Sequence, residues 1–138
     1  MPRSKKAALL DTNVLLRFLR ADDPVQSPRA RSLMERLDTG SEEAELEESV
    51  LAETVWMLER GFGTPRAEIA QQLSRVVALQ GLRVRGRRIL LAAMIRYAST
   101  RCDIVDCLLA ARAQSLGTTV YTFDADFKKL GCAWEEPA

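Results

Sequence analysis

The sequence predicts an α/β fold in which short parallel strands alternate with helices. Residues 7–10 form a continuous apolar run that leads straight into a helix-start segment, as is typical of a short buried strand. Residues 118–122 form a β-branched run after a helical stretch, and the apolar residues in between mostly recur at helical spacing. Strands that alternate with helices favour parallel βαβ units and an α/β sandwich.

Local signals place the individual elements in order along the chain. Strands are predicted where short apolar or alternating runs occur, at residues 7–10, 42–48, 82–84, 118–122 and 132–134. Helices are predicted where apolar residues recur at helical spacing, at residues 14–20, 28–40, 50–60, 64–81, 87–99 and 103–116. Residues 124–130 are predicted to form a turn or a short helix.

Capping residues set several of these boundaries. Ser27 before Pro28 predicts an N-cap with proline at the first helical position, and Ser49 is a candidate cap for the next helix. Gly117 closes the helix at 103–116. The segment 42–48 is rich in acids but alternates polar and apolar residues, so it is predicted to be a short edge-like strand.

Length and composition indicate one globular domain over residues 1–138. The chain has 138 residues, of which 47% are hydrophobic and 28% charged, enough for an apolar core. No apolar run approaches the length of a membrane span, and the run after the basic first residues is too short for a signal peptide. We therefore expect no membrane segment and a cytoplasmic location.

The three cysteines, Cys102, Cys107 and Cys132, are an odd number without metal-type spacing. We expect buried, reduced thiols, which agrees with a reducing compartment. The chain contains no histidine, so a histidine-activated thiol nucleophile is excluded.

Four acidic residues interrupt apolar sequence, and they carry most of the functional information: Asp11, Glu53, Asp106 and Asp124. A carboxylate in apolar surroundings usually pairs with a cation or coordinates a metal. Because the chain has no histidine, such a site has only oxygen ligands, which indicates Mg²⁺ or Mn²⁺ and phosphate chemistry. One or two ions of this kind can activate water without a side-chain base.

Their positions predict that these carboxylates meet. Asp11 and Asp124 each follow a predicted strand, Asp106 lies in the first turn of a helix, and Glu53 lies one turn into another. In parallel sheets, sites form beyond the carboxyl ends of the strands, so we expect all four at one sheet edge. Two further acids are supporting candidates, Asp103 as a ligand, a cap or a supporting acceptor, and Asp126 as the alternative to Asp124. Asp106 is favoured over Asp103 because apolar residues flank it, and Asp124 over Asp126 because it is closer to the strand.

Each acid also has an ordinary structural explanation. Asp11 and Asp106 suit helix starts, Glu53 could pair with an arginine, and Asp124 and Asp126 suit a turn. For any single acid, the ordinary explanation is about as good as metal ligation. Taken together, the positions of the four acids favour a metal site. The aromatic residues are expected in the core, namely Trp56, Tyr97, Tyr121 and Phe127.

Charge is distributed unevenly although the net charge is only +1. Residues 37–59 contain eight acids and no base, whereas residues 82–102 contain six arginines and no acid. A solvated helix face is the simple explanation for any one arginine. A basic block near a metal site favours contact with a nucleic-acid backbone, and the candidates are Arg83, Arg85, Arg87 and Arg88.

Four segments, in order, resemble the motifs of PIN-domain ribonucleases, and in particular the VapC-type toxins of bacterial toxin–antitoxin pairs. The segments are Leu10-Asp11-Thr12-Asn13-Val14-Leu15-Leu16, Val50-Leu51-Ala52-Glu53, Asp103-Ile104-Val105-Asp106-Cys107-Leu108-Leu109-Ala110-Ala111 and Tyr121-Thr122-Phe123-Asp124-Ala125-Asp126-Phe127. The resemblance extends from residue 7 to about residue 130. The segment 42–48 departs from it, because it is more acidic than the family's second strand.

The resemblance implies a three-layer α/β/α sandwich with a short central parallel sheet and Mg²⁺- or Mn²⁺-dependent endonucleolytic cleavage of RNA. By position, Asp11, Glu53, Asp106 and Asp124 match the family's acidic quartet. The family's polar residues after the first acid match Thr12 and Asn13, and its threonine before the fourth acid matches Thr122. The resemblance also implies a homodimer and a cognate antitoxin that blocks the site.

Three other functions remain as alternatives. A Mg²⁺-dependent phosphohydrolase of the haloacid-dehalogenase type needs a second Asp at position 13, where this chain has Asn13. A receiver-like signalling domain needs its phosphoacceptor at the end of a middle strand, whereas Glu53 and Asp106 are predicted in helices. A non-catalytic module that only binds RNA or an antitoxin would not need all four acids, so the complete quartet argues against this alternative.

Overall fold

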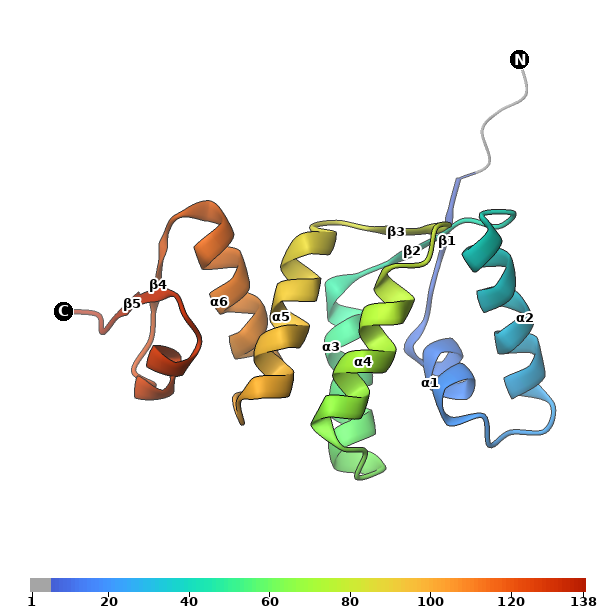
Figure 1. Ribbon diagram of the computed structural model, residues 1–138, viewed down its shortest axis with the longest axis horizontal. Coiled ribbons are helices and arrows are strands. Elements are labelled where there is room, and N and C mark those ends of the chain that lie inside the picture. Colours follow the sequence, from blue (N-terminus) through green and yellow to red (C-terminus); the bar gives the residue numbers. More distant parts are fainter. Residues whose placement is uncertain (1–5) are drawn as a thin grey trace, which may run out of the picture.

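The computed structural model describes residues 6–138, so residues 1–5 of the predicted domain lie outside the described part. Strands and helices alternate along much of the chain (Figure 1). In order they are β1 (Ala8–Leu9), α1 (Thr12–Arg20), α2 (Gln26–Thr39), β2 (Ala44–Leu46), α3 (Glu48–Trp56), the π-helical turn η1 (Met57–Gly61), α4 (Arg66–Val77), β3 (Leu82–Val84), α5 (Arg87–Ser99), α6 (Ile104–Leu116), β4 (Thr119–Tyr121), the 3₁₀ turn η2 (Ala125–Lys129) and β5 (Ala133–Glu135).

All strand pairs are parallel, which confirms the predicted α/β class. The strands nevertheless form two sheets rather than one: β1, β2 and β3 pair in that order, and β4 pairs only with β5. The β4–β5 sheet lies at the opposite end of the molecule from β1, α1 and α2 (Figure 1). The two strands that precede Asp11 and Asp124 therefore belong to different sheets.

The acidic segment around β2 was predicted to be an edge strand, and this prediction is wrong. Ala44 pairs with Ala8 of β1 on one side and with Leu82 of β3 on the other, so β2 is the central strand. Alternation explains the result, because Ala44 and Leu46 are buried while Glu43 stays exposed. Glu43 forms an ion pair with Arg83 at 2.7 Å.

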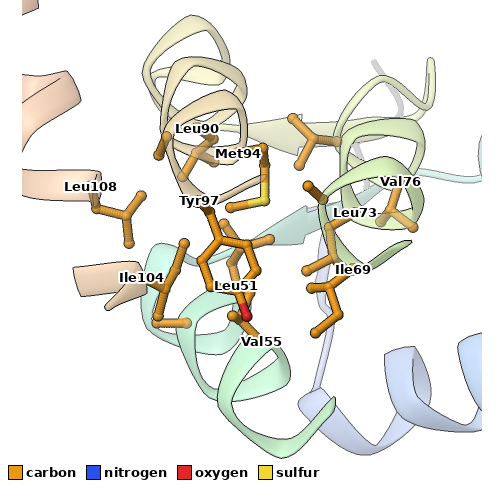
Figure 2. Packing of buried hydrophobic residues seen from close by; sticks show 14 of the residues in the cluster. Leu51, Val55, Ile69, Leu73, Val76, Leu90, Met94, Tyr97, Ile104 and Leu108 are labelled. Carbon is orange, nitrogen blue, oxygen red and sulfur yellow. The ribbon is translucent and has the colours of Figure 1, made fainter. Parts of the chain in front are cut away.

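The main core lies between α3, α4, α5 and α6. Figure 2 shows buried side chains from all four helices converging on one cluster. These side chains recur three or four residues apart on each helix, which places them on one face. The labelled members are Leu51, Val55, Ile69, Leu73, Val76, Leu90, Met94, Tyr97, Ile104 and Leu108. Over residues 6–138, no helix is both long and apolar enough to cross a bilayer.

Two predicted N-caps are wrong because both helices begin earlier than expected. Ser27 lies inside α2, where its hydroxyl donates to the carbonyl of Arg17 at 2.7 Å. Asp23 does the capping instead: its Oδ1 accepts hydrogen bonds from the backbone N–H groups of residues 25 and 26, at 2.9 and 2.6 Å. Ser49 likewise lies inside α3, which begins at Glu48.

Two helices are shorter than predicted. The helix at 50–60 changes at Met57 into the π-helical turn η1, and α4 ends at Val77 rather than near Gly81. At Gly81 the chain passes so close to residue 42 that an added Cβ would lie 2.1 Å from the carbonyl oxygen of Glu42. Glycine is therefore required there by close backbone approach.

Candidate functional site

The first group of candidate residues lies where α1 meets α3. Asp11 precedes α1 in the N-cap position, but its carboxylate makes no capping hydrogen bond. The buried hydroxyl of Thr12 donates to Oε2 of Glu53 at 3.2 Å. Asp11, Asn13 and Glu53 are all exposed, and among the described residues Glu53 has no arginine partner. Neither ordinary explanation of these two acids, a cap or an ion pair, is seen here.

The second group lies at the start of α6. Asp103 is the N-cap of this helix and accepts from the backbone N–H of Val105 at 2.9 Å. Its carboxylate also accepts from the indole N–H of Trp56 at 3.2 Å and from Arg60 at 3.5 Å. Asp106, one turn further on, has neither a hydrogen bond nor an ion pair with any other described side chain. Asp103 is thus structurally engaged, whereas Asp106 keeps its oxygens free.

Asp124 and Asp126 lie in the turn after β4. The carboxylate of Asp124 accepts from the backbone N–H of Asp126 at 2.9 Å, as expected for a turn residue. The hydroxyl of Thr122 accepts from the backbone N–H of Asp124 at 2.9 Å and so fixes the backbone before the acid. Asp126 forms an ion pair with Lys129 at 3.2 Å. The turn explanation therefore holds for Asp124, but it uses only one of the two carboxylate oxygens.

The carboxyl of Asp106 has a raised pKa. Burial is the largest cause, followed by the charges of Asp103, Asp124 and Asp126. Each of these causes penalises the ionised form. A bound cation would remove the penalty, so the electrostatics of this group favour cation binding.

The structure does not bring all four predicted ligands to one sheet edge. Asp11 and Glu53 are absent from the charges that raise the pKa of Asp106. Within residues 6–138, no three acidic or cysteine side chains lie close enough together to hold a metal ion. The two acids that follow strands, Asp11 and Asp124, come after β1 and β4, which belong to separate sheets. The oxygen donors suit Mg²⁺ or Mn²⁺ in kind but not in this spacing.

The four arginines predicted to contact RNA differ in their surroundings. Arg83 is paired with Glu43, and Arg87 donates to the carbonyl of Leu82. Arg85 and Arg88 are exposed and make no ion pair or hydrogen bond with the other described residues. These two have guanidinium groups free for a ligand.

Two aromatic residues that were expected in the core are exposed. Trp56 is 39% exposed and Tyr121 71% exposed, whereas Tyr97 and Phe127 are buried as predicted. Trp56 lies three residues after Glu53 and therefore on the same face of α3. This spacing is the one sequence signal that links Trp56 to the candidate site, and its partner Asp103 is 47 residues away.

A partly buried network behind the second group was not predicted. Arg66 donates to the carbonyls of Tyr97 and Cys102 and forms an ion pair with Glu59 at 3.0 Å. Its guanidinium lies 3.7 Å from the ring centre of Tyr97, whose hydroxyl donates to Glu59 at 2.6 Å. Burial raises the pKa of Glu59, but the hydrogen bonds from Tyr97 and Arg66 outweigh it and lower the pKa overall. The network anchors the segment that leads to Asp103.

The thiols were expected to be buried and reduced. Cys107 is buried, and all three cysteines are free, while Cys102 and Cys132 are only partly buried. Burial raises the pKa of the Cys107 thiol to about 11, so it stays protonated at neutral pH.

Comparison with known proteins connects these features to a family. The model of the PIN domain family matches residues 8–131. The chain is also 29% identical over 124 residues to a VapC ribonuclease of Aquifex aeolicus (strain VF5), covering 89% of this chain and 91% of that protein. The match contains every candidate acid from Asp11 to Asp126. The chain therefore belongs to the PIN domain family.

Proposed function

We propose that the protein is an endoribonuclease that hydrolyses RNA phosphodiester bonds, and that it is the toxin of a toxin–antitoxin pair. One observation carries the proposal: the PIN family match spans residues 8–131 and includes all four carboxylates of the sequence-predicted quartet. The name of the Aquifex relative supports RNA as the substrate. The free oxygens of Asp106 and its raised pKa support a cationic ligand beside α6.

The proposed cofactor is Mg²⁺ or Mn²⁺, one or two ions, with Asp11, Glu53, Asp106 and Asp124 as ligands. When bound, such an ion supplies an activated water and a Lewis acid for the phosphate. An ion that takes ligands from both groups needs them closer together than they lie in this structure. The polar neighbours then have positioning roles: Thr12 holds Glu53, and Thr122 fixes the backbone before Asp124.

Cleavage of total cellular RNA with and without Mn²⁺ tests the proposal. We expect cleavage with Mn²⁺, none in EDTA, and none for Asp106→Asn, because the amide oxygen is a weaker ligand without charge. Circular dichroism of the variant checks that its fold is intact. Equal cleavage in EDTA would exclude the metal mechanism. Release of phosphate from p-nitrophenyl phosphate without RNA cleavage would favour the phosphohydrolase alternative.

A cognate antitoxin and a homodimer belong to the same proposal. The name of the Aquifex relative, VapC ribonuclease, supports this part of the proposal. Light scattering after size exclusion measures the oligomeric state, with a mass of twice 15.4 kDa expected for the dimer. A mass of 15.4 kDa at all protein concentrations tested would contradict it.

A further inference from the structure

A groove between α1 and α2 borders Asp11 and is lined by arginines. It encloses about 650 Å³, and its polar lining includes Asp11, Asn13, Arg17, Arg29 and Arg36. Asp11 is the single acid among the lining residues. The groove therefore joins one predicted metal ligand to three guanidinium groups, none of which belongs to the arginine block at 82–102.

The three arginines are free to different degrees. Arg17 uses its Nε in a 2.7 Å hydrogen bond to Gln26, which leaves its two terminal nitrogens without a partner among the described residues. Arg36 donates to Ser32 at 2.8 Å and faces Glu42 in a long ion pair of 3.6 Å. Arg29 is exposed and makes neither an ion pair nor a hydrogen bond with the other described residues. Arg29 is thus the most available cation of the groove.

A solvated helix face is the simple alternative, and the rest of α2 argues against it. Arg31, two residues from Arg29 and on another face of α2, lines two neighbouring grooves that also contain acids. Those acids are Asp22, Asp23, Glu35 and Asp38. Charge around α2 is therefore divided: acids of α2 and of the loop before it lie beside Arg31, and arginines line the side that borders Asp11.

The spacing of the arginines suits an extended polyanion. Arg29 and Arg36 are seven residues apart, which is two helical turns or about 10 Å along the axis. A single phosphate ion cannot contact both guanidinium groups over that length, whereas a nucleic-acid strand carries a phosphate at every nucleotide. Arginine is also well suited to phosphate because its guanidinium donates two parallel hydrogen bonds.

We propose that the groove lined by Arg17, Arg29 and Arg36 binds the phosphate backbone of the RNA substrate next to Asp11. This inference rests on the proposed function, and it identifies a substrate path on α1 and α2 instead of on the arginines of β3 and α5. Phosphate contacts position a strand without reading its sequence, so this groove contributes affinity and not base preference.

Binding of a fluorescein-labelled single-stranded RNA, measured by anisotropy, tests the groove. The parent protein carries Asp106→Asn, so that the RNA is not cut during the measurement. We expect Arg29→Ala to raise Kd about fivefold to tenfold and to reduce the slope of log Kd against log salt by about 0.7. Arg31→Ala is the matched control, and we expect its Kd within about twofold of the parent.

Three outcomes overturn the inference. They are an unchanged Kd for both Arg29→Ala and Arg29→Ala/Arg36→Ala, an equal loss of RNA affinity in Arg31→Ala, and no RNA binding by the parent.

Cleavage assays distinguish failure of the groove proposal from failure of the proposed function. If the otherwise native chain cleaves RNA with Mn²⁺ and Arg29→Ala leaves KM unchanged, the groove is wrong and the function stands. If nothing is cleaved but Arg29→Ala still weakens RNA binding, the groove stands and the nuclease proposal fails.

Discussion

Replacing Arg66 tests whether its partly buried network with Glu59 and Tyr97 supports the start of α6. Arg66→Met keeps an unbranched stem of similar length but removes the charge and every donor. The change deletes hydrogen bonds to the carbonyls of Tyr97 and Cys102, the ion pair with Glu59 and the contact with the Tyr97 ring. It also leaves the Glu59 carboxylate with Tyr97 as its remaining hydrogen-bond partner.

The magnitude follows from what is lost. A hydrogen bond to a charged group contributes about 1.5–3 kcal/mol, and removing one member of a buried pair costs about 3–5 kcal/mol. These contributions overlap, and the side chains of Arg66 and Glu59 are 21% and 32% exposed, so we take the lower end of the range, a loss of about 3 kcal/mol. Unfolding entropy of about 2.1 cal/mol/K per residue then converts this loss into a fall in Tm of about 10 °C for 138 residues.

Thermal unfolding followed by circular dichroism measures this fall directly. Arg101→Met is the matched control, because Arg101 is exposed, lies in the segment before α6 and makes no ion pair or hydrogen bond with the other described residues. We expect its Tm within about 2 °C of the native chain. A fall of less than about 2 °C for Arg66→Met, or an equal fall in the control, would refute the role given to the network.

Three further predictions concern stability. Tyr97→Phe removes the 2.6 Å hydrogen bond to Glu59 and should cost about 1.5–3 kcal/mol in urea unfolding; no measurable loss would contradict that bond. Gly81→Ala should cost about 1–3 kcal/mol, because its Cβ would lie 2.1 Å from a carbonyl oxygen, whereas Gly61→Ala meets no atom within 4 Å and should cost less. Asp106→Asn should raise the Tm of the metal-free protein at pH 7, because the raised pKa of Asp106 disfavours the ionised form in the fold. The difference in Tm between the variant and the native chain should shrink as pH falls through the pKa of Asp106, because the native carboxyl then becomes protonated. A difference that grows on acidification would contradict the raised pKa.

Much of the secondary structure was predictable because its signals are local. The helix predicted at 87–99 and the strand at 82–84 have the same bounds in the structure, and the helix at 103–116 differs by its first residue, which is the cap Asp103. The spacing of apolar residues and a glycine after the last turn determine such elements, and both signals lie within one or two turns of the chain. The prediction at Ser27 failed because Asp23, four residues earlier, accepts the backbone hydrogen bonds at the start of the helix.

Pairing between distant segments was not predictable from the same signals. The acids of segment 42–48 suggested an edge, yet alternation buries Ala44 and Leu46 and lets β2 pair on both sides. Nothing in the strand sequences indicated that β4 would pair with β5 alone. Strand order depends on which hydrophobic faces meet, and this is settled by packing of the whole chain.

The sequence by itself determined the family and the order of the acids along the chain, because residue identities are enough for both. Only the tertiary structure decided which carboxylates have free oxygens. Asp103 and Asp106 look alike in sequence, but Trp56 and Arg60 reach Asp103 from more than 40 residues away and leave Asp106 free. The structure also placed arginines of α1 and α2 beside Asp11. Such partners are brought together by helix packing, which no local pattern records.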